Sequence, residues 1–203
     1  RRAAASGYDG VEFADRFLQE PPGELAGALD ETGLVPVAVH ADLPTIEAAL
    51  AGENDLFERC RTVGCGRVII PHLDPRQFRD GESVRALADR LTAVASGMNE
   101  EGLELGLHND RRWLSPLLPD GVGTFIDVTP TPDGAGGYLQ EAVRRLRSRT
   151  TGAVPRSTPL WHLVAQTESD AIGFELEVAE LHAGGVAPTE ALFAEPEHPY
   201  TRA

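Results

Sequence analysis

The sequence predicts an α/β fold with parallel strands, and two observations support that prediction. From residue 9 to residue 109, short apolar or β-branched runs alternate with longer segments of helical periodicity. Each helical segment ends near a glycine (Gly33, Gly64 or Gly102) that can adopt the left-handed C-cap conformation. Alternating strands and helices form parallel β/α units. A repeat of roughly 30 residues per unit fits either an open doubly wound sheet or a closed barrel.

The expected elements can be placed in order along the chain. No glycine-rich turn follows the first apolar run, which weighs against the dinucleotide-binding form of the doubly wound fold. The expected helices lie around Glu24–Glu31, Thr45–Val63 and Glu82–Glu101. The expected strands lie at Asp9–Ala14, Val35–His40, Arg67–Leu73, Leu103–Asn109 and, much later, Ile172–Val178.

The β/α pattern stops after Leu118 and resumes near residue 160. Residues 111 to 159 contain seven Arg against four acidic residues, whereas the whole chain has a net charge of −14. We therefore divide the chain into a barrel-like or sheet segment (1–119), a Gly/Pro/Arg-rich insertion (120–158), a further helix and strand (159–185) and a tail (186–203). The insertion and tail offer few apolar residues and are expected to pack poorly.

The charge balance excludes several classes of function. All 18 basic residues are Arg, so a lysine Schiff base and the phosphate-binding lysine of a P-loop are excluded. The acidic balance argues against a nucleic-acid partner. No apolar run approaches the roughly 20 residues that cross a bilayer, so no membrane partner is expected. An acidic, lysine-free chain suits a high-salt cytoplasm, and we expect a cytoplasmic, halophile-like protein.

Cys60 and Cys65 are the two cysteines of the chain. Their spacing matches no zinc-binding pattern, and free cysteines are among the residues most often buried. Buried free thiols are therefore expected. The first residues contain neither Met nor a signal-peptide core, and we expect a cut or misassigned N-terminus.

Polar residues recur where the expected parallel strands end. In parallel β/α folds these ends meet on one face, where catalytic groups are collected. Two carboxylates on the last expected strand, two residues apart, point the same way. With nearby imidazoles they could hold a divalent cation or act as an acid/base pair. The residues of this candidate site are Glu12, His40, His72, His108, Asn109, Glu175 and Glu177.

Four segments resemble the sugar phosphate isomerase/epimerase family, which has the xylose isomerase-like barrel: GYDGVEFA, VGCGRVIIPHLDP, LGLHN and GFELEV. The resemblance covers roughly residues 3–118 and 160–185. It implies a partial (β/α) TIM barrel of about five parallel strands, the second to sixth of the eight in such a barrel. It also implies a divalent metal (Mn, Mg, Co or Zn) and a small-molecule sugar or sugar phosphate as substrate. By this resemblance Glu177 is a metal ligand, and the catalytic residues are Glu12, His40, His72, His108 and Asn109.

The chain also departs from that family. After the fifth strand the family reads His-Asn-His and then a metal-binding Glu, where this chain has Asp110 and Trp113. The seventh and eighth strands, with their ligands, are not recognisable. The expectation is an impaired isomerase or epimerase with weak metal binding and little turnover; the alternative is a non-catalytic fragment or fusion product. An endonuclease of the related barrel type would need more metal-binding His and a basic groove.

Two further expectations concern the end of the chain and the edges of the sheet. Residues 185–203, including PTEALFAEPEHPYTRA, resemble the segment that follows the ATPase domain of oligopeptide and dipeptide ABC transporter ATP-binding subunits. Because a Walker A motif requires lysine, ATPase activity is not implied. The open edges of a partial barrel invite pairing with another chain, so a homo-oligomer is expected.

Overall fold

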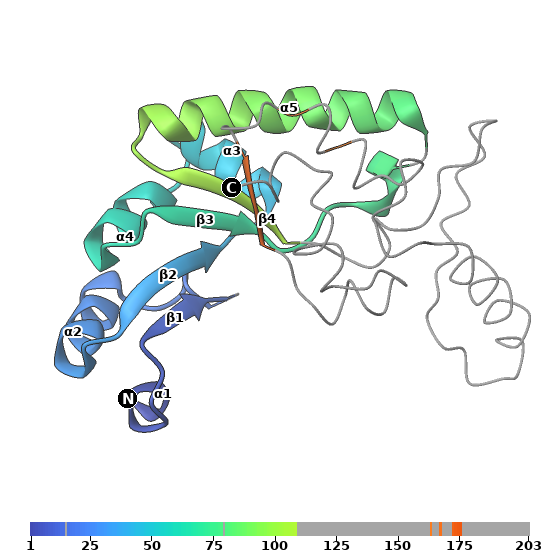
Figure 1. Ribbon diagram of the computed structural model, residues 1–203. Helices are drawn as coiled ribbons and strands as arrows, with labels where there is room; N and C mark the ends of the chain where they lie inside the picture. Colours follow the sequence, from blue (N-terminus) through green and yellow to red (C-terminus); the bar gives the residue numbers. More distant parts are fainter. Residues whose placement is uncertain (15, 79, 109–162, 164–166, 168–171, 176–203) are drawn as a thin grey trace, which may run out of the picture. The chain divides into compact units, whose positions relative to one another are not determined.

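The computed structural model describes residues 1–14, 16–78, 80–108, 163, 167 and 172–175. Five strands form one parallel sheet in the order β1-β2-β3-β4-β5, so spatial order follows chain order (Figure 1). The predicted α/β class and its parallel sheet are confirmed. The strands are β1 (Gly10–Phe13), β2 (Val35–His40), β3 (Arg67–Ile70), β4 (Glu104–His108) and β5 (Ile172–Glu175).

The chain divides into two compact units, and all five strands belong to the first. That unit comprises Arg1–Leu73, Leu91–His108 and Asp170–Glu175. Residues 74–90 belong to the second unit. The predicted insertion and tail lie outside the described residues, as does the helix predicted around residues 160–168, apart from Leu163 and Thr167. No helix in the described part of the chain is long and apolar enough to span a membrane.

The helices follow the strands as predicted, with one correction. The prediction of a single helix over Thr45–Val63 was wrong, because the segment forms two helices with a turn between them. Gly52 in that turn has φ 74°, and the Asn54 side chain bonds both the Thr45 carbonyl (2.8 Å) and the Leu56 amide (3.0 Å). The helices are α1 (Arg2–Ala5), α2 (Pro22–Thr32), α3 (Leu43–Leu50), α4 (Leu56–Val63) and α5 (Gly81–Glu100), with a 3₁₀ turn, η1 (Pro75–Phe78).

The predicted glycine caps are confirmed by positive φ angles of 69° at Gly33, 72° at Gly64 and 75° at Gly102. At the end of α4, the Cys65 amide donates to the Cys60 carbonyl at 2.9 Å, and the Gly64 amide donates to the Arg61 carbonyl at 3.1 Å. This bond pattern is the Schellman motif, which places the side chains on either side of the cap together. Cys60 and Cys65 are buried and free, as predicted.

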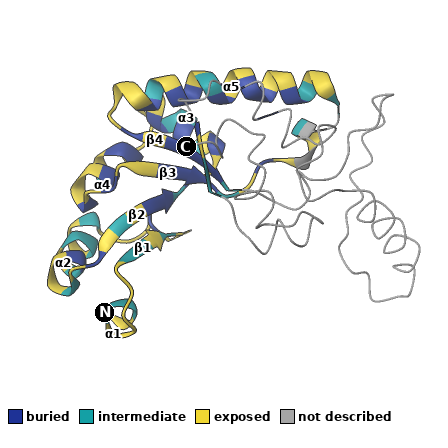
Figure 2. Cartoon of the chain, viewed as in Figure 1, coloured by how far each residue is buried: buried dark blue, intermediate teal, exposed yellow. Residues whose placement is uncertain are grey.

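The two faces of the sheet have different compositions, which the strand register defines. One face is apolar and forms much of the core, and Figure 2 shows its buried residues along the central strands. Because side chains alternate along a strand, residues of one face are two apart, and their register partners share that face. The apolar face includes Val39, Val68, Ile70, Leu105, Leu107 and Ile172, each at most 2% exposed.

The opposite face carries polar groups near the strand ends and small residues below them. The register partners on this face are Glu12↔Ala38, His40↔Ile69, Ile69↔Gly106, Gly106↔Gly173 and His108↔Glu175. A Cβ at Gly106 would lie 3.0 Å from Ile69 Cγ1, so the Ile69 side chain occupies the space beside this glycine. The face therefore offers one large apolar side chain, small neighbours and a polar row at the C-terminal ends of the strands.

Candidate functional site

Glu12, His40 and Glu175 converge at the C-terminal ends of β1, β2 and β5. The His40 Nε2 atom lies 3.6 Å from Glu12 Oε2 and 3.8 Å from Glu175 Oε2. One potential ligand atom from each of the three residues lies within 4.8 Å of the other two. Both carboxylates therefore approach the same imidazole nitrogen. We call these three residues the Glu-His-Glu cluster.

Local backbone geometry sets the direction of these side chains. Val11 pairs with Pro36 and Glu12 pairs with Ala38, so β2 has one extra residue, Val37, opposite β1. Such a bulge turns the strand locally and re-aims the side chains that follow it. His40, the last residue of β2, follows this irregularity and faces the polar side of the sheet.

Two atoms of the cluster are buried without a hydrogen-bond partner among the described residues: His40 Nε2 and Glu175 Oε2. The side chains themselves are partly accessible, with 17% of His40, 35% of Glu12 and 30% of Glu175 exposed. Buried polar atoms are nearly always satisfied, because leaving one unpaired is unfavourable by about 1–3 kcal/mol. A shared cation or a polar ligand at this position would satisfy both atoms.

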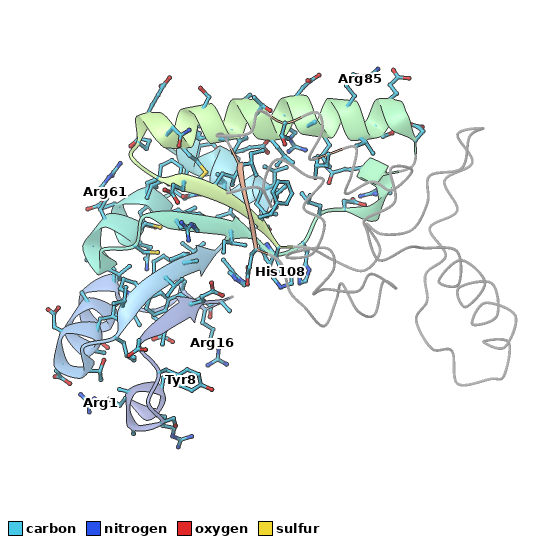
Figure 3. All side chains as sticks on the ribbon, viewed as in Figure 1. Arg1, Tyr8, Arg16, Arg61, Arg85 and His108 are labelled. Carbon is cyan, nitrogen blue, oxygen red and sulfur yellow. The ribbon has the colours of Figure 1, made fainter. Side chains whose placement is uncertain are left out.

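His108 adds a fourth polar group beside the cluster. Its ring centroid lies 6.3 Å from that of His40, with the two rings inclined at 71°. His108 ends β4 and is the register partner of Glu175 on β5. Figure 3 shows His108 where the strands end. Four of the five strands thus contribute a polar side chain to one end of the sheet.

The predicted site residues fall into three groups. The structure brings Glu12, His40 and His108 together at the predicted end of the sheet. His72 lies two residues beyond β3 and is exposed, and it is not part of the Glu-His-Glu cluster. Asn109 and Glu177 lie outside the described residues.

Glu175 is the site residue whose position the sequence indicated only weakly. Alternation along the last strand grouped it with Glu177, and the family resemblance then favoured Glu177 as the ligand. The register of β4 with β5 places Glu175 opposite His108, at the level of the other polar groups. Sequence alone could not provide that register, because 63 residues separate the two strands.

The cluster could hold a divalent cation, since one ligand atom from each residue lies within 4.8 Å of the other two. With metal–ligand bonds of about 2.0–2.2 Å, ligand atoms around one ion lie roughly 3–4.3 Å apart. The 3.6 and 3.8 Å separations in the cluster already fall in that range. Three protein ligands with an open position are typical of catalytic metal sites. The donor set, one imidazole nitrogen and two carboxylate oxygens, suits Zn²⁺, Mn²⁺ or Co²⁺ better than Mg²⁺.

Comparisons with known proteins indicate the same fold. No protein-family model and no curated protein matches this sequence. Among solved structures, a sugar phosphate isomerase/epimerase from Parabacteroides distasonis is 15% identical with a TM-score of 0.63, covering 93% of this chain and 62% of that one. A second such structure from the same organism is 12% identical with a TM-score of 0.69, covering 97% and 68%. The IOLI protein, crystallised with a bound zinc atom, is 16% identical with a TM-score of 0.55, covering 91% and 58%.

These similarities show the fold, which is that of a partial (β/α) barrel with five parallel strands in one open sheet. The chain spans 62% and 68% of the lengths of the two Parabacteroides structures. The predicted fold is therefore confirmed. The resemblance of residues 185–203 to transporter ATP-binding subunits gains no support, since none of these three structures is such a protein.

Proposed function

We propose that this protein is a metal-dependent isomerase or epimerase acting on a sugar or sugar phosphate. The observation that supports the proposal best is the convergence of Glu12, His40 and Glu175 at the C-terminal ends of a parallel sheet. This is where barrels of this kind collect their catalytic groups. The solved structures with this fold include two sugar phosphate isomerase/epimerases and a zinc-containing protein.

In this proposal the Glu-His-Glu cluster holds the cation. A bound divalent metal acts as a Lewis acid that polarises the carbonyl and hydroxyl oxygens of a sugar. Glu12 and Glu175 supply the negative charge that attracts the cation, and His40 supplies a neutral nitrogen donor that favours Zn²⁺, Mn²⁺ or Co²⁺ over Mg²⁺. Glu177, the ligand implied by the family resemblance, lies outside the described residues and is a further ligand candidate.

His108 is the proposed proton-transfer group. In the proton-transfer route of isomerisation, a proton leaves one carbon of the sugar and is returned to the neighbouring carbon. In epimerisation by this route, it is returned to the other face of the same carbon. An imidazole beside the cluster, but not part of it, can take and return that proton at a ring nitrogen. Positioned acid/base groups typically contribute about 10²–10⁴-fold in rate. His108 lies beside His40 at this point, with its ring centroid 6.3 Å away.

The layer of residues below the polar row forms the floor of the proposed site. Barrel interiors are usually filled by layers of bulky branched side chains. Here the layer beneath the polar row has Gly106 and Gly173 beside one Ile69. Because Ile69 is 3% exposed, a polyhydroxylated ligand would lie above this layer, where its hydroxyls can reach the polar groups.

The test combines metal titration with a substrate panel. Calorimetric titration with Mn²⁺ and Zn²⁺ should show binding that weakens at least tenfold in Glu175→Gln. Binding should be unchanged in Glu53→Gln, the same chemical change on an exposed turn residue. Metal-loaded protein should then interconvert a member of a panel of aldoses, ketoses and their phosphates, and His108→Gln should lower kcat without weakening metal binding.

Two outcomes would contradict the proposal. If Glu175→Gln and Glu53→Gln bind metal equally well, the Glu-His-Glu cluster is not the metal site. If the metal-loaded protein turns over no sugar on the panel, the chain is the non-catalytic protein that the sequence left open as the alternative. A Glu177→Gln variant distinguishes the ligand implied by the family resemblance from the ligand that the geometry supports.

A further inference from the structure

Glu12 and Glu175 belong to the two edge strands of the described sheet. β1 pairs with β2 alone and β5 pairs with β4 alone, and three strands lie between them. In a flat sheet with strands about 4.8 Å apart, β1 and β5 would lie roughly 19 Å from each other. A carboxylate oxygen of Glu12 nevertheless lies within 4.8 Å of one from Glu175.

The side chains alone cannot span that gap. A glutamate reaches roughly 5 Å from its Cα to its carboxylate oxygens, so the two Cα atoms lie no more than about 15 Å apart. The sheet must therefore curve until its edges face each other across the mouth of an incomplete barrel. At that size the interior of an eight-stranded barrel is just wide enough for side chains to meet.

The hydrogen-bonded ladder is shortest at the junction between β2 and β3. Two register pairs connect these strands, Val39↔Val68 and His40↔Ile69, whereas four connect each of the other neighbouring pairs. The junction separates β1 and β2 from β3, β4 and β5. Glu12 and His40 lie on one side of it and Glu175 lies on the other, so a ligand shared by all three residues bridges the weakest part of the ladder.

Charge makes the curved arrangement depend on what occupies the cluster. Two carboxylates facing each other repel, and two buried atoms of the cluster have no hydrogen-bond partner in the part of the chain that the structure describes. A divalent cation replaces that repulsion with attraction to both edges. Each edge strand is four residues long and has one neighbour, so neither edge has another partner of comparable strength within the described sheet.

We propose that the cation of the Glu-His-Glu cluster also acts as a structural clamp, which fixes the curvature of the open sheet by joining β1 and β2 to β5. This inference rests on the metal site of the proposed function but not on turnover. The clamp makes the folding of the two edge strands depend on metal, and it couples them although they are not neighbours.

Hydrogen–deuterium exchange with and without Zn²⁺ or Mn²⁺ tests the clamp. At a cation concentration about a hundredfold above Kd, exchange through opening of the cluster should slow by up to about a hundredfold in peptides covering β1 and β5 together. The melting temperature should rise by about 5–10 °C under the same conditions. Glu53→Gln should respond as the unmodified chain does.

The variants Glu12→Gln and Glu175→Gln distinguish a cation that joins both edge strands from a cation that is held by one edge strand alone. Each removes the ligand of one edge, and each should abolish the added protection at both edges even when the cation concentration is raised to saturate the variant. If calorimetry detects binding but protection rises at one edge or at neither, the clamp is refuted and the metal site of the proposed function stands. If no cation binds to the unmodified chain, the metal-dependent function fails with it.

Discussion

Charged side chains lie at both ends of the sheet, but their hydrogen bonding and their exposure to water differ. At the N-terminal end Arg67 and Glu104 are register partners on β3 and β4, joined at 2.7 Å, with 48% and 66% of their side chains exposed. At the C-terminal end His40 Nε2 lies 3.6 Å from Glu12 Oε2 and 3.8 Å from Glu175 Oε2. Two atoms of this cluster are buried without a hydrogen-bond partner among the described residues. One end has a hydrogen-bonded ion pair exposed to water, whereas the other has charged and polar groups that are partly shielded from water and incompletely hydrogen-bonded within the described residues.

That difference separates a stabilising role from a binding role. Exposed ion pairs contribute about 0–1 kcal/mol each, and their loss is easily tolerated. Buried groups without partners destabilise the fold, and they persist where a ligand or a reaction requires them. Substitutions at the two ends of the sheet should therefore change stability and metal binding differently.

The largest predicted change in stability concerns Cys60 and Cys65, the buried thiols on the N-terminal side of β3. Burial, together with the neighbouring Cys65, raises the pKa of the Cys60 thiol to about 12 from an ordinary value of 9.0. The unfolded thiol therefore loses its proton first as pH rises. The contribution of the protonated Cys60 thiol to the free energy of unfolding is complete below pH 9. It is lost toward pH 12, by about 1.4 kcal/mol per pH unit. Denaturant unfolding from pH 8 to pH 11 should show a shallower alkaline decline in Cys60→Ala, and equal slopes would contradict the assignment.

A second prediction concerns the glycines of the two edge strands. A Cβ at Gly10 would lie 2.7 Å from Val37 Cγ2 and 3.0 Å from the Val35 carbonyl oxygen, whereas the nearest atom to a Cβ at Gly173 is 3.7 Å away. Gly10→Ala should therefore cost about 1–3 kcal/mol of unfolding free energy, because the backbone contact cannot yield as a side chain can. Gly173→Ala should stay within about 0.5 kcal/mol. Urea unfolding of both variants measures the difference, and equal costs would refute it.

The third prediction is a substitution that stabilises the protein, whereas most substitutions destabilise it. With chelator present, Glu175→Gln should stabilise the fold by about 1 kcal/mol, because it removes a carboxylate that faces Glu12 and introduces an amide that can donate to His40 Nε2. Glu53→Gln, on its exposed turn, is the matched control. A loss of stability in Glu175→Gln under metal-free conditions would mean that the cluster is a stabilising ion pair and not an unsatisfied site.

Local sequence signals account for most of the described fold. Apolar runs located the strands, because a buried parallel strand needs them, and the capping glycines marked where helices end. The turn that separates α3 from α4 was missed, since helical periodicity continues on both sides of Gly52 and the side-chain bonds of Asn54 are visible only in three dimensions.

The candidate site was only partly predictable, for a different reason. Strand-end position identified Glu12, His40 and His108, because the parallel arrangement alone brings those ends together. The same criterion also selected His72, which lies two residues beyond the end of β3 and is exposed. The position of Glu175 beside the other polar groups depends on register and on the curvature of the sheet. Both are long-range properties, and no local pattern encodes them.

The smallest expected effect lies at the N-terminal end of the sheet. Arg67→Ala removes the partner of Glu104, and because both side chains are about half exposed the loss should be about 0.2–1 kcal/mol. Screening should shrink that difference in 1 M salt, where the Debye length is about 3 Å. A double-mutant cycle with Glu104→Ala isolates the pair energy, and calorimetry should show unchanged metal affinity in Arg67→Ala. A coupling well above 1 kcal/mol that persists at high salt, or a loss of metal binding, would mean that the two ends of the sheet are not the independent regions that their charges indicate.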